Sequence, residues 1–322
     1  MKFEVKSEGA PERLDVWLAE KLEGLSRSRI RRLIDKGFVT VNGQPASAHR
    51  KATPGTTVEI VVPEPAPVAL VPEDIPLDVL FEDSEIIVIN KPAGIVVHPG
   101  AGRATGTIVN ALLHHCNDLA DIGDEQRPGI VHRLDKDTTG ALVCVKTAVT
   151  MEKLSRQFKE SRVCKEYVAL VAGVPEPPGG NIDKPITRSR SDRKKMAVAD
   201  TGEKQSGSVI RTRREAQTGY DVEENYGDCS LVRFYPRTGR THQIRVHAKS
   251  IGHHILGDRQ YRSRRQEPQL NPPVLRQMLH AEVLSFCHPV LGSPLDITAP
   301  WPEDFERAVA FLRKRRAKEA AH

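Results

Sequence analysis

A run of prolines divides this chain more sharply than any other feature of its sequence. Five prolines fall within fourteen residues, at Pro63, Pro65, Pro67, Pro72 and Pro76. Each proline fixes its own φ angle and lacks a backbone donor, so such a run suits neither a helix nor a central strand. We therefore predict a semi-rigid linker over residues 63–76, with a small unit at 1–62 and a larger one at 77–322.

The small unit is predicted to be an α+β module with one basic helix. Apolar residues recur at helical spacing over 13–23, and a second helix is expected from Ser26, a candidate N-cap, to Gly37. Asn42-Gly43 then predicts a hairpin. The module resembles the alpha-L RNA-binding module first seen in a small-subunit ribosomal protein. Its candidate RNA-binding cations are Arg27, Arg31, Arg32 and Lys36. The alternative is a basic face that only solubilises the protein.

Strand signals dominate the larger unit. Apolar and β-branched runs predict strands at 86–89, 141–145, 167–171, 229–234 and 281–286. Helices are predicted at about 106–115, 148–161, 241–251 and 303–316. Because the strands and helices show no regular βαβ alternation, we expect an α+β fold with a mainly antiparallel, mixed sheet.

The segment 127–140 carries the first candidate for chemistry. Asp135 stands between a basic pair, His132 and Arg133, and a turn-forming Asp-Thr-Thr-Gly. A carboxylate held beside positive charge stays ionised, and an ionised carboxylate can act as a nucleophile. The alternative is an aspartate that only caps a turn or a helix.

The second candidate segment, 238–247, is rich in cations. Between residues 231 and 250 there are five Lys or Arg and no Asp or Glu. An arginine buried there needs an anion, because isolated buried charge is very costly. Asp135 is therefore a candidate partner for Arg245, although a solvated basic face is the other interpretation.

Four segments together resemble the pseudouridine synthases of the RluA family, most closely its RluD branch. They are Asn-Lys-Pro-Ala-Gly-Ile-Val-Val-His-Pro at 90–99, His-Arg-Leu-Asp at 132–135 with Thr-Gly at 139–140, Lys-Glu-Tyr at 165–167, and Gly-Arg-Thr-His-Gln-Ile-Arg-Val-His at 239–247. They stand in the family's order and spacing over roughly 77–300. The resemblance implies the pseudouridine synthase fold, a long mixed sheet crossed by a central cleft.

The resemblance also implies roles for individual residues. Asp135 would be the catalytic carboxylate, Arg245 its partner, and Tyr167 the ring that stacks on the target base. Arg133 would fill the space left by the flipped uridine or hold a phosphate. The other residues expected to contact RNA are His132, Arg240 and His242. The plainer alternatives are a half-buried strand tyrosine at 167 and a structural arginine at 133.

Pseudouridine formation requires little besides a placed carboxylate. The bond from ribose to uracil nitrogen breaks, the base turns, and a bond to carbon forms, so no electrons enter. We therefore expect no cofactor and no metal. Asp135 can attack the ribose, attack the uracil ring or abstract a ribose proton, and the sequence leaves these routes open. In each, the uridine must leave its stack.

Composition narrows the partners and the compartment. A net charge of +6 and a pI near 9.1 favour a polyanionic partner, here RNA. Five cysteines without a Cys-x-x-Cys pair argue against a zinc ribbon and suit a reducing cytosol. No apolar signal core or membrane-spanning stretch is evident. We expect a cytoplasmic monomer that binds no membrane and acts on large-subunit ribosomal RNA or a pre-ribosomal particle.

Three rival functions remain open at the level of sequence. The first is a pseudouridine synthase that acts on transfer RNA, and the second is a ribosome-assembly factor that binds RNA without catalysis. A methyltransferase with the same N-terminal module is the third, although no convincing Gly-x-Gly-x-x-Gly follows a strand. Binding alone does not need Asp135, Tyr167 and Arg245 together, which favours an enzyme.

Overall fold

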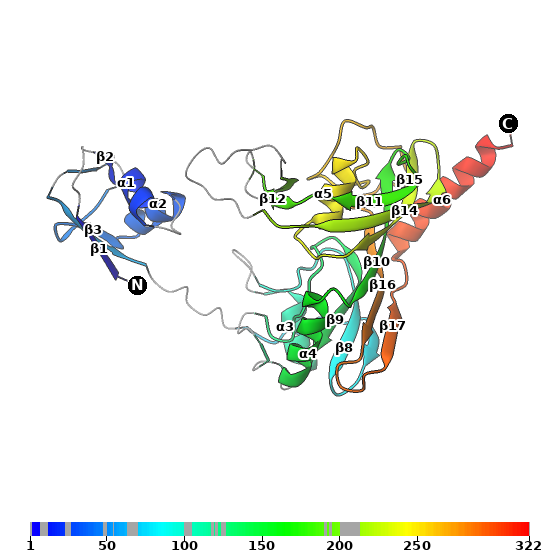
Figure 1. Cartoon of the computed structure of the whole chain (residues 1–322), viewed down its shortest axis with the longest axis horizontal. Coiled ribbons are helices and arrows are strands. Elements are labelled where there is room, and N and C mark those ends of the chain that lie inside the picture. The colour runs from blue at the N-terminus through cyan, green and yellow to red at the C-terminus, as the bar shows by residue number, and fades with distance from the viewer. Residues whose placement is uncertain are drawn as a thin grey trace. The chain divides into compact units, whose positions relative to one another are not determined.

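The computed structural model divides the chain into two compact units, Met1–Val68 and Ala69–His322 (Figure 1). It describes residues 2–6, 12–22, 27–47, 50–53, 55–62, 70–99, 105–116, 119, 122–123, 127–189, 192, 195–199 and 213–321. The predicted N-cap Ser26 lies outside these residues. None of the helices in the described ranges is long and apolar enough to cross a bilayer.

The division falls inside the segment predicted to be a linker, and the second half of that segment is attached to the larger unit. Asn110 donates its side-chain amide to the Val71 carbonyl at 2.8 Å. Glu73 accepts the Gly106 N–H at 2.9 Å, and its own N–H reaches the Asn110 carbonyl at 3.0 Å. Residues 71–75 therefore belong structurally to the larger unit, and only the stretch before them lies at the division.

The smaller unit packs two helices, α1 (Leu14–Lys21) and α2 (Arg27–Asp35), with short strands. One sheet has the order β1 (Lys2–Lys6), β6 (Thr57–Val61), β3 (Val39–Val41) and β4 (Gln44–Pro45), and β2 (Glu12–Arg13) pairs with β5 (Lys51–Ala52). Its core includes Leu14, Leu18, Ile30, Val39, Val58 and Ile60. The predicted hairpin is confirmed, because Asn42 and Gly43 both have positive φ and join β3 to β4.

One large mixed sheet forms the second unit. Its order is β11 (Gly179–Asp183), β14 (Gln217–Asn225), β15 (Cys229–Pro236), β10 (Cys164–Ala172), β16 (Leu279–Cys287), β9 (Thr139–Val145), β8 (Ile86–Lys91) and β7 (Val79–Glu82), with β17 (Pro294–Thr298) beside β16. A separate ribbon pairs β12 (Ile186–Arg188) with β13 (Met196–Val198). The α+β class with a mixed, mainly antiparallel sheet is confirmed.

The parallel contact between β9 and β16 lies at the middle of this sheet, beside the segment that carries Asp135. It pairs His280 with Thr139 and Ala281 with Gly140. Gly140 has φ 114°, and a Cβ atom there would lie 2.1 Å from the Ala281 carbonyl oxygen. Only glycine permits this approach. Gly140, the last residue of the predicted Asp-Thr-Thr-Gly turn, is thus required for the close pairing of β9 with β16.

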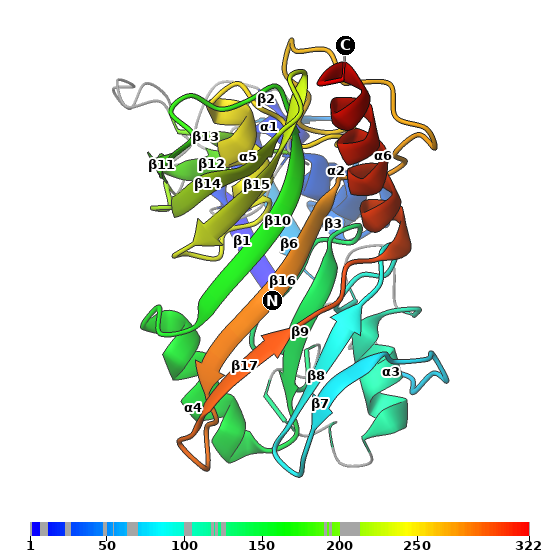
Figure 2. The same ribbon diagram turned by 90° about the vertical axis from the view of Figure 1, so that its right-hand side faces the viewer.

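Helices cover the sheet on both faces. Figure 1 shows α3 (Ile108–His115), α4 (Ala148–Lys159) and α5 (Gln243–Ser250) on one face, and Figure 2 shows α6 (Glu303–Glu319) on the other. Two apolar cores result, one around β10, β15, α5 and α6 and one around β8, β9, α3 and α4. Tyr167 of β10 packs against both cores. Tyr167 therefore lies where the two halves of the larger unit, each built around one of these cores, meet.

Every predicted helix and strand of the larger unit is present, with ends that differ by a few residues. Strands β7, β11, β14 and β17 and the β12–β13 ribbon were not predicted. β14 shows why: its sequence, Gln-Thr-Gly-Tyr-Asp-Val-Glu-Glu-Asn, is mostly polar and exposes alternate residues. Pairing with β11 and β15 makes it a strand, and that pairing is not a local property.

Candidate active site

A cavity of about 560 Å³ opens where the two halves of the large unit meet. Its walls come from the loop 127–138, from the end of α4, from β10 and from residues 236–245. The lining includes the basic residues Arg127, Arg133, Lys159, Lys165, Arg237, Arg240 and Arg245. Asp135 is the one carboxylate among the described lining residues. The cavity can therefore attract a polyanion and offer it a single carboxylate.

Two cationic side chains hold the backbone beside Asp135. The ammonium of Lys91, at the end of β8, donates to the carbonyls of Pro92, Ile95 and Lys136 at 2.7, 2.9 and 3.0 Å. Burial lowers its pKa to about 7, against the opposing charges of Asp137 and Asp135. Three carbonyls match the three N–H groups of an ammonium. Lys91 therefore ties the turn after Asp135 to the segment 92–95.

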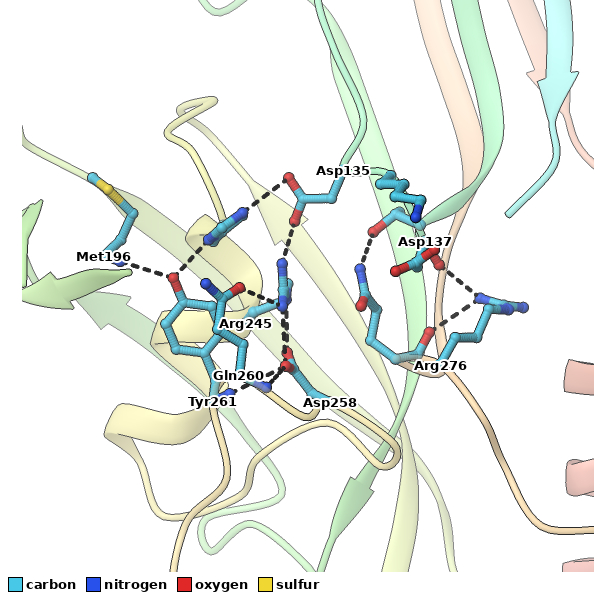
Figure 3. Close-up of polar contacts among 12 residues, drawn as sticks. Asp135, Asp137, Met196, Arg245, Asp258, Gln260, Tyr261 and Arg276 are labelled. Atoms are coloured by element: carbon cyan, nitrogen blue, oxygen red, sulfur yellow. Dashed lines mark hydrogen bonds and ion pairs between the residues drawn. The ribbon is translucent and has the colours of Figure 1, made fainter. Parts of the chain in front are cut away.

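Arg276 holds the same turn from the opposite side. Its Nη1 donates to the Asp137 carbonyl at 3.1 Å (Figure 3). Its Nε and Nη2 each lie 2.7 Å from an oxygen of the Asp304 carboxylate. The Thr138 N–H closes the turn on the Asp135 carbonyl at 3.1 Å. These contacts engage backbone atoms of the turn, so the carboxylate of Asp135 remains available to the cavity.

Arg245 of α5 joins Asp135 to a second carboxylate. Its Nη1 lies 3.0 Å from Asp135 Oδ2, and its Nε and Nη2 lie 2.6 and 3.0 Å from the two oxygens of Asp258 (Figure 3). The side chains of Arg245, Asp258 and Asp135 are 7%, 1% and 15% exposed. Burial disfavours the charged arginine, but Asp258 and Asp135 raise the pKa of Arg245 overall. The contact expected between Arg245 and Asp135 is present.

Two further residues complete the surroundings of Arg245. Its Nη2 donates to Gln260 Oε1 at 3.1 Å, and its guanidinium carbon lies 4.8 Å from the centre of the Tyr261 ring. The N–H groups of Gln260 and Tyr261 in turn donate to Asp258 Oδ1 at 2.9 and 3.1 Å. Asp258 is thus saturated with donors, whereas Asp135 keeps an open side.

Tyr167 and Lys165 line the cavity from the same face of β10. Burial raises the pKa of Tyr167, and the charge of Asp135 adds to that effect, so the phenol is neutral. Burial also lowers the pKa of Lys165. No ion pair links Lys165 to another described residue, so its amino group on the cavity wall is available to a ligand. Tyr167 is half-buried in the strand and also lines the cavity, so its stacking on the target base stays a prediction.

His132 is not the cation that the sequence suggested. Its Nε2 accepts the Val143 N–H at 3.0 Å, and its ring stacks on Phe158 with centroids 4.7 Å apart. Burial, with the nearby charge of Lys165, lowers its pKa to about 3. A neutral, packed ring contributes no positive charge beside Asp135. Arg133 is exposed on the cavity wall and forms no hydrogen bond or ion pair with a described residue.

The loop before α5 is held by a buried glutamine. Gln243 Oε1 accepts from the Thr238 hydroxyl at 2.8 Å and from the Arg240 N–H at 2.9 Å. Arg240 lines the cavity, and its Nε donates to the Glu215 carbonyl at 3.0 Å. His242 was predicted to contact RNA, but its Nε2 lies only 3.8 Å from Asp135 Oδ1. The segment thus places His242 near the predicted catalytic residue and Arg240 on the wall of the same cavity.

Comparison with known proteins agrees with this arrangement. The sequence profile of the RNA pseudouridylate synthases matches residues 85–250, a span that contains Asp135, Tyr167 and Arg245. The chain is 45% identical over 306 residues to an uncharacterized RNA pseudouridine synthase of Synechocystis sp., covering 94% of this chain and 90% of that protein. This chain belongs to the RNA pseudouridine synthase family.

Other relatives of the synthase carry more specific names. It is 39% identical over 322 residues to ribosomal large subunit pseudouridine synthase D of Haemophilus influenzae, covering 97% of this chain and 95% of that protein. The solved structure of human RNA pseudouridylate synthase domain containing 4 matches with a TM-score of 0.58 at 28% identity, over 73% of this chain and 92% of that one. The synthase is therefore an enzyme that makes pseudouridine in RNA.

The smaller unit of the synthase matches the S4 domain over residues 12–58. Of its four predicted RNA contacts, Arg27 has an internal partner, because its Nε lies 2.9 Å from Asp15 Oδ2. The side chains of Arg31, Arg32 and Lys36 are exposed and form no hydrogen bond or ion pair with a described residue. These three remain free to meet phosphates.

Sequence reasoning missed four residues of the candidate site of the synthase. Lys91, Asp258 and Arg276 hold its parts in place, and Lys165 lines its cavity. Lys91 and Lys165 lie inside segments that carried the resemblance, and a lysine beside buried strand residues was a usable signal. Asp258 follows Gly257, where a Cβ atom would lie 2.1 Å from the Arg276 carbonyl oxygen. A Gly-Asp pair marks a tight turn but does not reveal what the carboxylate holds.

Proposed function

We propose that this synthase converts specific uridines of large-subunit ribosomal RNA to pseudouridine, with Asp135 as the catalytic carboxylate and without a cofactor. The observation that carries the proposal is the Asp135 carboxylate, open to a basic cavity on one side and ion-paired on the other with the buried Arg245. Relatives named as large-subunit synthases, similar over nearly the whole chain, support the choice of RNA.

The cavity suits an extruded nucleoside. Its volume of about 560 Å³ lies in the range of small-ligand sites. In the proposed complex the uracil ring stacks on Tyr167, and the ribose lies against Asp135. Arg133 and Arg240, on the cavity wall, contact the neighbouring phosphates. Arg245 holds Oδ2 of Asp135 and so fixes the direction of the carboxylate.

The reaction balances without an added reagent. The bond between ribose C1′ and uracil N1 breaks, C1′ bonds to C5, the proton on C5 is lost and N1 gains one. No electrons are exchanged, so residues that bind, orient and move protons suffice. We therefore expect activity to survive EDTA in metal-free buffer, with RNA folding monitored separately. Loss of activity that one added metal restores would contradict a cofactor-free mechanism.

In this role the synthase acts as a cytoplasmic monomer on free or partly assembled large-subunit RNA. Pseudouridine positions should be mapped in total RNA from cells with the gene, without it, and with the gene carrying Asp135→Asn. The proposal expects defined large-subunit sites to disappear in the second and third strains. Disappearance only from transfer RNA would reassign the substrate. Restoration of all modifications by the Asn variant would remove Asp135 from the chemistry.

A further inference from the structure

His242 has an unusual backbone for its position. It is the residue before α5 and has φ 56° and ψ 23°, in the left-handed region. Among the described non-glycine residues, only Asn42 and Ser161 share a positive φ. A glycine would adopt this conformation without cost. A side chain kept in an unfavourable backbone conformation suggests that its ring has a function, and such residues concentrate at active sites.

The ring of His242 is held from one side by Tyr261. His242 Nδ1 lies 2.6 Å from the Tyr261 hydroxyl oxygen, and the rings meet edge to face. The same hydroxyl oxygen accepts the Met196 N–H at 2.8 Å (Figure 3). With the Met196 N–H directed at the oxygen, the hydroxyl proton has Nδ1 as its nearest acceptor among the described residues. Nδ1 therefore accepts, and in a neutral ring the proton is on Nε2.

The surroundings of the ring favour that neutral form. Burial lowers the pKa of His242, and Arg245 and Arg133 lower it further, against the opposing charges of Asp135 and Asp258. The Nε2–H then faces Asp135 Oδ1 at 3.8 Å. This is longer than a hydrogen bond, but contacts of this kind often shorten when substrate fills the site.

We propose that His242 is a positioning residue for Asp135, with its Nε2–H presented by the Tyr261 hydroxyl. The proposal rests on the catalytic role proposed above for Asp135. Arg245 contacts only Oδ2, and one contact leaves the carboxylate free to turn about its Cβ–Cγ bond. A second donor at Oδ1 fixes the plane of the carboxylate relative to the uridine. Sequence reasoning had assigned His242 to RNA binding instead.

Three substitutions at His242 separate the ring from the backbone. His242→Asn and His242→Gly both tolerate the left-handed conformation and remove the N–H that faces Asp135. Each should slow single-turnover pseudouridine formation at saturating RNA by roughly 10–100-fold, because a misplacement of about 1 Å in a reacting group can cost about 10²-fold in rate. The RNA dissociation constant should stay within about twofold. The glycine variant should be as slow as the asparagine variant although it relieves the backbone conformation. His242→Gln, whose longer amide can reach Asp135, should recover part of the rate.

A double-mutant cycle tests the link to Tyr261. Tyr261→Phe removes the hydroxyl that orients the ring, and it should slow the reaction less than His242→Asn. Combined with His242→Asn it should add nothing, because the two residues act through one contact. Nitrogen-15 NMR of labelled histidine should show Nε2–H in the wild type and a changed ring signal in Tyr261→Phe.

Each contrary outcome has a definite meaning. Weaker RNA binding at an unchanged rate in His242→Asn would return His242 to the RNA contacts, and strictly additive rate losses would exclude action through Tyr261. Asp135→Asn is measured alongside. If that variant turns over normally, the proposed function fails. If it is inactive while His242→Asn and His242→Gly are as fast as the wild type, only the role of His242 is overturned.

Discussion

Each unit of this protein has a three-residue charge cluster around a buried central ion, and the two central ions have opposite charges. In the smaller unit the central group is the carboxylate of Asp15, which receives Arg13 Nε at 3.0 Å and Arg27 Nε at 2.9 Å. In the larger unit the central group is the guanidinium of Arg245, between Asp258 and Asp135. In each cluster the central ion is buried and has two partners of opposite charge.

The exposure of the outer groups separates the two clusters. Asp15 is 1% exposed, while the side chains of Arg13 and Arg27 are 40% and 55% exposed, so the only anion is sealed from solvent. Around Arg245, Asp258 is sealed at 1% but Asp135 is open at 15%. A carboxylate without access to solvent or substrate can only stabilise the fold. A carboxylate that is anchored by an arginine and still partly exposed to a cavity can react.

The largest expected effect is on Asp135. Replacing it with Asn keeps the shape of the side chain and removes its basic and nucleophilic character, so the rate should fall at least about 10³-fold. RNA binding and the melting temperature should stay close to wild type. The measurement is release of the uracil C5 proton as tritium from labelled RNA. Wild-type release would contradict the comparison, because Asp135 would then be as structural as Asp15.

Arg245→Ala should impair both activity and folding. The variant leaves Asp258 buried without its cation, which typically costs about 3–5 kcal/mol of unfolding free energy. Activity should fall far more than RNA affinity, because Arg245 orients Asp135 and does not face solvent. Denaturant unfolding and single-turnover rates report the two effects separately.

A compensated variant distinguishes the two roles of Arg245. Arg245→Met combined with Asp258→Asn removes the stranded charge, so stability should largely return while the rate stays low. If the rate returned together with stability, Arg245 would act only as a structural ion, as the arginines around Asp15 do.

Asp15→Asn should affect stability and leave catalysis intact. Two charge-assisted hydrogen bonds are weakened, so unfolding of the smaller unit should become easier by roughly 1–3 kcal/mol. Although burial alone would raise it, Arg13 and Arg27 lower the pKa of Asp15 below its ordinary 3.8. The folded state then binds the proton less readily than the unfolded state. The stabilisation is therefore complete above about pH 4–5 and is lost as the pH falls further.

The acid dependence provides the control for that prediction. Chemical unfolding of the smaller unit, followed at neutral pH and near pH 3, should show a steeper loss for the wild type than for Asp15→Asn. Turnover at saturating RNA should be unchanged at neutral pH. An equal acid response in both proteins would mean that the Asp15 cluster contributes no pH-dependent stability.

The smallest effect is expected from the exposed cations of α2. Changing Arg31, Arg32 and Lys36 to Gln should weaken RNA binding and lower the slope of log affinity against log salt by about 0.7–0.9 for each phosphate that the variant no longer neutralises. The rate at saturating RNA should persist. Arg27→Gln is the matched control, since its guanidinium is bound to Asp15 and its removal should change stability more than the salt slope. Identical slopes in wild type and triple variant would remove α2 from the RNA-binding surface.

Local patterns in the sequence determined much of this protein. The proline run predicted a division near residue 63, and the observed units divide after Val68. Apolar periodicity predicted the main strands and helices because it reports burial on one face, which is a local property. Electrostatics also predicted one long-range contact. A buried arginine in the cation-rich segment 238–247 needs an anion, and Arg245 does contact Asp135, 110 residues earlier.

Only the tertiary structure decided which titratable side chains are charged and which charged side chains are available to a ligand. The sequence predicts His132 to be a cation, but the ring is buried against Phe158 and is therefore neutral. The sequence predicts Arg27 to contact a phosphate, but its guanidinium binds the buried carboxylate of Asp15 in the other helix of the unit. Protonation and availability depend on desolvation and on distant partners, and neither is encoded in neighbouring residues. The same holds for Asp258 and Tyr261, which acquire their roles because the turn that carries them folds against α5 and thereby orders Arg245 and His242 around Asp135.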